Sequence, residues 1–111
     1  ADDCRRTGMY KITFYVPDTH LELVKAALFN AGAGRVGAYD SCAWQVKGQG
    51  QFRPLAGSNP FVGEHGLLEA VDEYKVELVC DDVNIQAAIA ALKSAHPYEM
   101  PAYDVVQLLD L

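Results

Sequence analysis

"SAHPYEMPAYDV", residues 94–105, joins an apolar helical pattern to an alternating pattern near the end of the chain. Pro97 disfavours a helical conformation at His96, so the preceding helix should end there. Pro101 further restricts the backbone before "AYDVVQLLDL", 102–111, which has the composition and alternation of a strand. The stretch therefore predicts a rigid connector between a helix and the last strand.

Three other segments show the alternation of half-buried strands: 9–16, 40–47 and 70–80. We expect the following residues to share inward faces, in the order of these segments: Tyr10, Ile12, Phe14 and Val16; Cys42, Trp44 and Val46; Tyr74, Val76, Leu78 and Cys80. This pattern predicts that Trp44 is a core residue. Full burial of that side chain would make its truncation to alanine cost about 3–5 kcal/mol.

Two helices are expected between these strands. Thr19 and Glu22 have the spacing of a capping box, so the first helix should begin near residue 19. Its apolar stripe should end at the glycines of "AGAGRVG", 31–37, a run that follows a helix and so does not fit a dinucleotide-binding loop. "DDVN", 81–84, supplies cap residues and acids to the second helix. The apolar stripes consist of Leu21, Val24, Leu28 and Ala31, then of Ile85, Ile89 and Leu92.

The resulting order, β-α-β-β-α-β, predicts a ferredoxin-like α+β fold. Two helices should cover one face of an antiparallel sheet, with an extended loop or hairpin between the middle strands. The other sheet face is partly apolar, which favours burial against further copies of the chain. We assign the domain to residues 9–111, and interpret the polar residues 1–8 as an upstream remnant.

Composition narrows the function classes. The chain has 111 residues and a formal net charge of −6, which disfavours a nucleic-acid partner. No apolar run approaches the roughly 20 residues of a membrane helix. The three cysteines are widely separated and do not form a disulfide or metal-binding pattern, so we expect a reducing, cytoplasmic setting.

Two motifs resemble known families. "HPYEMP", 96–101, resembles the HPYE-x-P signature of the CutA divalent-cation-tolerance proteins, which are trimers related in fold to the PII signalling proteins. "GAGRVGAYDSCAWQVKGQGQFRPLAGSNPFVGEHGLLEAVDE", 32–73, with "AHPYEMPAYDV", 95–105, is similar to the inserted central domain of the Ngg-one-interacting-factor-three-like (dinuclear metal centre) family. The likeness covers residues 9–109 and implies a PII/CutA-like fold with a sensing role by analogy. In that family the two metal ions are held by the flanking halves, so the dinuclear site should not transfer to this chain.

The segment 48–66 contains the first candidate site. It is rich in turn-forming residues, and loops of this length are uncommon unless they have a function or are disordered. Phe61, Glu64 and His65 are its ligand-binding candidates, because the corresponding loop of PII-like proteins senses nucleotides. The alternative is a packed hairpin extension in which Phe52, Phe61 and Val62 cover the sheet. The sequence is compatible with both interpretations.

The connector contains the second candidate site. His96 and Glu99 supply an imidazole and a carboxylate that suit a divalent cation, but two ligands make an incomplete site unless neighbouring subunits add others. We expect mainly a structural role, in which the connector lies at a subunit contact and Tyr98 packs. Tyr98 and Arg35 complete the set of ligand-binding candidates, since Arg35 could face a ligand or a carboxylate.

No residue pattern is specific enough to nominate a catalytic site, so we expect no enzyme activity. The leading hypothesis is a non-enzymatic homotrimer that binds a small effector between subunits and passes the signal to a protein partner. The alternatives are a CutA-type divalent-metal-binding protein and a purely structural oligomerisation module. A hydrolase or cyclohydrolase activity would follow from the family name only.

Overall fold

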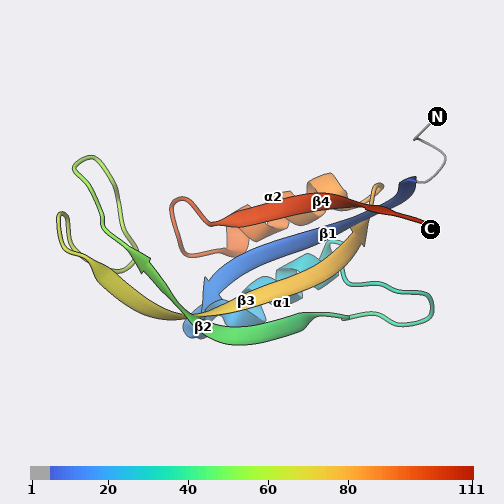
Figure 1. Ribbon diagram of the computed structural model, residues 1–111, viewed down its shortest axis with the longest axis horizontal. Coiled ribbons are helices and arrows are strands. Elements are labelled where there is room, and N and C mark those ends of the chain that lie inside the picture. Colours follow the sequence, from blue (N-terminus) through green and yellow to red (C-terminus); the bar gives the residue numbers. More distant parts are fainter. Residues whose placement is uncertain (1–5) are drawn as a thin grey trace.

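The computed structural model describes residues 6–111 and shows a four-stranded antiparallel sheet with both helices on one face (Figure 1). The elements are β1 (Arg6–Pro17), a 3₁₀ turn (Asp18–His20), α1 (Leu21–Asn30), β2 (Trp44–Phe52), β3 (Glu69–Asp81), α2 (Ile85–Ala95) and β4 (Tyr103–Leu109). The strands lie in the order β2-β3-β1-β4, and every neighbouring pair is antiparallel. The ferredoxin-like α+β fold is confirmed.

The core lies between the sheet and the two helices. Phe14 of β1 pairs with Val76 of β3, and Ile12 with Leu78, so alternate residues of both central strands face the helices. The helices supply Leu21, Val24, Leu28, Ala88 and Leu92 to the same buried cluster. Periodicity thus predicted the inward faces of β1, β3 and both helices.

The helix ends are set by the backbone conformation of particular residues more than by side-chain capping hydrogen bonds. His96 is extended, with φ −71° and ψ 136°, so α2 ends where the following proline requires. Gly32 ends α1 at φ +103°, a backbone conformation that glycine adopts readily. The expected capping box does not form: Thr19 Oγ1 instead lies 2.9 Å from His20 Nδ1, and α1 begins at Leu21 after the 3₁₀ turn.

The segment between the middle strands is a hairpin, which fits the expected extended loop or hairpin. β2 continues through Gly48 and Gly50 to Phe52, so these glycines do not interrupt the strand. Because β1 ends opposite Glu73, the paired residues nearer the loop have no other strand beside them. We call residues 49–72 the hairpin arm; it projects beyond the rest of the sheet (Figure 1).

The expectation that Trp44 belongs to the core is wrong. Trp44 pairs with Glu77 and Val46 with Lys75, which places both on the sheet face away from the helices, and 59% of Trp44 is exposed. Alternation shows which residues share a face, but a strand at the sheet edge can turn its apolar side either way. Cys42 precedes the strand and is only half-buried, so its expected burial is also incorrect.

The first strand starts earlier than its sequence pattern suggested. β1 begins at Arg6, and the register of its pairing with β4 shifts between Arg6 and Tyr10. Residues 6–8 therefore belong to the sheet, whereas the remainder of the expected remnant, 1–5, lies outside the described residues. Within residues 6–111, neither helix has the length and apolar character needed to cross a membrane.

Candidate functional site

A cavity of about 330 Å³ lies where the hairpin arm meets the connector between α2 and β4. Four aromatic residues contribute to its lining: Tyr15, Phe52, Phe61 and Tyr98. The remaining lining residues are Gly50, Gln51, Pro54, Ser58, Pro60, Val62, Glu73, Glu99, Met100 and Ala102. The site thus combines the two segments that the sequence singled out separately.

His96 fixes the connector against β1. Its side chain is buried, and its Nε2–H donates a hydrogen bond to the carbonyl oxygen of Tyr15 at 2.6 Å. Its Nδ1 accepts the backbone N–H of Tyr98 at 3.1 Å. These two bonds require the neutral tautomer with hydrogen on Nε2. Burial lowers the pKa of His96, against the opposing effects of the Tyr15 carbonyl and Glu73.

Tyr98 belongs to the connector, and its ring faces the phenylalanines of the hairpin arm across the cavity. Its ring centre lies 6.2 Å from that of Phe52 and 6.3 Å from that of Phe61, in tilted arrangements. Its hydroxyl group is buried and has no hydrogen-bond partner among the described residues. Burial, together with the nearby Glu73 carboxylate, raises the pKa of Tyr98, so the phenol is neutral at physiological pH.

The loop of the hairpin arm is attached to the connector through polar contacts. Glu99 accepts the backbone N–H of Asn59 at 3.0 Å, across 40 positions of sequence. His65 Nε2 donates to the Ser58 carbonyl oxygen at 2.8 Å, which braces the loop internally. Phe61 lies edge-on to the His20 ring at 5.3 Å, and 51% of its surface is exposed. The loop is therefore held at two points, by Glu99 of the connector and by His20 of the 3₁₀ turn.

Glu73 is the site residue that the sequence did not identify. Its alternation on β3 marked it only as part of a charged outer face, yet its side chain lines the cavity. The available signal was Gly50 on the neighbouring strand. A Cβ atom at Gly50 would overlap Glu73 Oε1, so the absence of a side chain there leaves room for the carboxylate.

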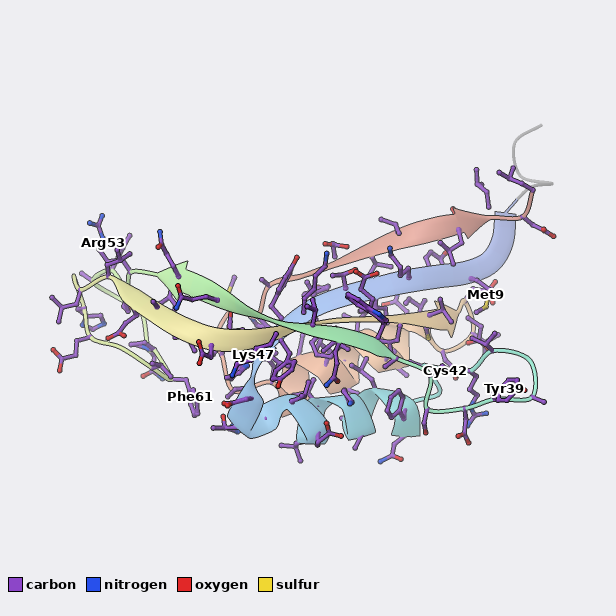
Figure 2. The ribbon with its side chains drawn as sticks, turned by 60° about the horizontal axis from the view of Figure 1, so that its bottom comes forward. Met9, Tyr39, Cys42, Lys47, Arg53 and Phe61 are labelled. Atoms are coloured by element: carbon purple, nitrogen blue, oxygen red, sulfur yellow. The ribbon has the colours of Figure 1, made fainter. Side chains whose placement is uncertain are left out.

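The structure brings together some of the candidate residues and separates others. Phe61, Tyr98 and Glu99 all line the cavity. Glu64 is exposed and His65 acts within the loop, so neither lines it. Arg35 lines a shallow hollow with Tyr39 and Asp40, and Figure 2 shows Tyr39 at the opposite end of the molecule from Phe61.

The geometry does not favour a cation held by His96 and Glu99. Both ring nitrogens of His96 already take part in hydrogen bonds, and Glu99 receives the Asn59 N–H. In residues 6–111 no three His, Cys, Asp or Glu side chains are grouped so that they could hold a metal ion. Divalent-metal binding remains a prediction from the resemblance alone.

The fold and the connector define a class of proteins, the CutA-like domains. CutA from Xylella fastidiosa has a TM-score of 0.66, covering 92% of this chain and 85% of that protein; at 23% identity this likeness shows the fold alone. A Bacillus cereus protein related to NIF3 has a TM-score of 0.76 at 40% identity, covering 90% of this chain and 25% of that protein. No protein-family model matches the chain.

Curated relatives point to the same family. The chain is 44% identical over 101 residues to a Halalkalibacterium halodurans protein, and 47% identical over 95 residues to one from Bacillus subtilis. Both are named GTP cyclohydrolase 1 type 2 homolog, and the matches cover 91% and 86% of this chain. They span only 27% and 26% of the relatives' lengths. The chain therefore matches a CutA-like domain of the NIF3 family, as the sequence motifs indicated.

Proposed function

We propose that the chain is a non-catalytic binding domain whose small-molecule ligand occupies the cavity between the hairpin arm and the connector. The observation that supports this proposal most strongly is the lining of that cavity: aromatic and apolar side chains with a few polar groups, among them a buried Tyr98 hydroxyl that lacks a partner. Small-molecule sites commonly have this composition, and an unpaired buried polar group calls for an explanation.

A regulatory role follows from where the cavity lies. One wall belongs to the hairpin arm, which projects from the sheet, and the other to a connector fixed by His96. A ligand that contacts both walls would favour one position of the arm over others, and a protein partner could read that change. The two described free thiols, Cys42 and Cys80, fit the reducing cytoplasm that we propose as the setting.

The lining residues do not support a catalytic alternative. Ser58 Oγ donates to the Leu55 carbonyl oxygen at 2.7 Å, so no base activates it in this arrangement. The raised pKa of Tyr98 makes that phenol a poor source of a nucleophilic oxygen. Because the matches span only 27% and 26% of the relatives named cyclohydrolase homologues, we attribute any such reaction to parts of those proteins outside the matched segment.

Phe61→Ala tests the binding function. Phe61 is half exposed, so its truncation should cost less than about 1 kcal/mol of stability. Loss of one aromatic wall should nevertheless weaken ligand binding about tenfold. The measurement is an unfolding midpoint beside the affinity for compounds found by a thermal-shift screen of wild type. A large stability loss with unchanged affinity would show that the segment serves only as packing.

A second proposed property is self-association through the open sheet face, most simply as a homotrimer. Trp44, Val46 and Val106 leave apolar surface exposed on that face, whose centre carries the ion pairs of Glu77 with Lys11 and Lys75. Such a partly apolar face is typical of an interface between copies.

Trp44→Ala tests this second property. Because Trp44 is exposed within one chain, the variant should fold normally but associate more weakly than wild type. Light scattering over a range of concentrations measures the mass of both proteins, and Leu23→Ala, on the outer side of α1, is the matched control. A wild-type chain that stays monomeric at micromolar concentration would exclude self-association.

A further inference from the structure

We infer that the cavity between the hairpin arm and the connector selects organic cations, namely compounds with an ammonium group on an aromatic or apolar body. This inference rests on the proposed binding function and specifies its ligand class. Two carboxylates, Glu73 and Glu99, line the cavity, and none of its lining residues is a lysine or an arginine. The charges of the site therefore have one sign.

The aromatic rings provide the second part of the argument. The ring centre of Tyr98 lies 6.2 Å from that of Phe52 and 6.3 Å from that of Phe61. The faces of such rings attract cations, and groups of them recognise ammonium compounds in other proteins. A neutral Tyr98 adds its ring without bringing a charge. The same rings can cover the apolar body of the ligand.

Glu73 is the carboxylate best placed to receive the ammonium group. It is half-buried, and no lysine or arginine pairs with it in the part of the chain that the structure describes. Glu99 already accepts the Asn59 N–H, whereas the protein group near the Glu73 carboxylate is the neutral Tyr98 hydroxyl, which leaves its charge uncompensated. A partly buried carboxylate without a counter-ion attracts a cation more strongly than a solvated one, because the surrounding dielectric is lower.

The same arrangement disfavours anionic ligands. The four described lysine–carboxylate pairs involve Lys11, Lys25, Lys47 and Lys75, and none of these lysines lines the cavity. A nucleotide would place its phosphates beside Glu73 or Glu99 with no cation to neutralise them. The word GTP in the relatives' name therefore does not describe the ligand that this cavity fits.

Three probes with the same ring and different head groups test the inference: benzylammonium, benzyl alcohol and phenylacetate. Their affinities for the wild-type chain can be measured by NMR titration in about 0.15 M salt, where long-range charge effects are screened beyond roughly 8 Å. We expect benzylammonium to bind about tenfold more tightly than benzyl alcohol. A factor of this size is what contact of one ammonium group with a carboxylate and an aromatic ring should provide. Phenylacetate should bind least.

Glu73→Gln assigns the effect to one residue. The variant should lose most of the preference for benzylammonium and keep its affinity for benzyl alcohol. Asp72→Asn is the matched control, because it removes the same charge one position away, on the opposite face of β3, where Asp72 lies 3.9 Å from Lys47. This control should retain the preference.

The possible outcomes separate the two proposals. Equal or weaker binding of benzylammonium compared with benzyl alcohol would overturn the cation inference while leaving a small-molecule site. A preference that survives in Glu73→Gln, or that is lost equally in Asp72→Asn, would also overturn it, because the general charge of the chain would then be the cause. Failure of all three probes to shift any resonance of the cavity residues would contradict the binding function itself.

Discussion

Replacing Phe14 with alanine should lower the free energy of unfolding by about 3–5 kcal/mol, the largest effect of any change considered. Phe14 is the largest of the fully buried side chains and lies in the central strand, between β3 and β4. Its loss removes apolar contacts and leaves a cavity that the surrounding helices can fill only in part. Chemical denaturation monitored by circular dichroism gives the free energy directly.

Leu23→Ala is the control for this change. It also shortens a large apolar side chain, but Leu23 lies on the exposed side of α1, so the cost should stay within about 0.5 kcal/mol. Equal losses in the two variants would show that the core does not lie between the sheet and the helices.

His96→Ala should cost about 2–4 kcal/mol, because it removes the donor to the Tyr15 carbonyl and the acceptor for the Tyr98 N–H within a buried environment. His96→Gln supplies an amide that can still donate to Tyr15, so it should lose less. The measurement is again the free energy of unfolding at pH 7.5. A loss in His96→Ala no larger than that in Leu23→Ala would contradict the anchoring role.

The same residue predicts a dependence of stability on pH. Burial holds the folded pKa of His96 below 6.5, so the unfolded chain binds the proton first as the pH falls. Stability should therefore be complete above pH 6.5 and decrease below it, by at most about 1.4 kcal/mol per pH unit, down to the folded pKa. Glu73 opposes this shift and His20 adds to it. His96→Gln should flatten the profile below pH 6.5; an unchanged profile would assign it to other groups.

Much of the fold could be predicted because the central elements carry strong periodicity. β1 and β3 are flanked by other strands and covered on one face by the helices, so their alternation translates directly into burial. β2 is an edge strand, and its outward Trp44 shows that apolar alternation does not say which face a strand buries. The capping box predicted at Thr19 does not form, because the Thr19 hydroxyl group is hydrogen-bonded to the neighbouring His20 ring.

The candidate site could be predicted only in pieces. Phe61, Tyr98 and Glu99 were each recognisable from composition and motif, but nothing in the sequence indicates that the hairpin arm folds back toward the connector. The sequence did not identify Glu73 as a site residue, because a charged residue in an alternating strand is usually solvated. Its partner Gly50 offered the clearest signal, since a glycine within a strand often marks a close approach of another group.

A crystal structure of the chain grown with benzylammonium tests the central claim, that the cavity between the hairpin arm and the connector is a small-molecule site, most directly. We expect density for the compound among Phe52, Phe61 and Tyr98, with its nitrogen directed toward Glu73. Side chains from a neighbouring copy filling this cavity, with the compound bound elsewhere or not at all, would contradict the claim and identify the cavity as part of an interface between copies.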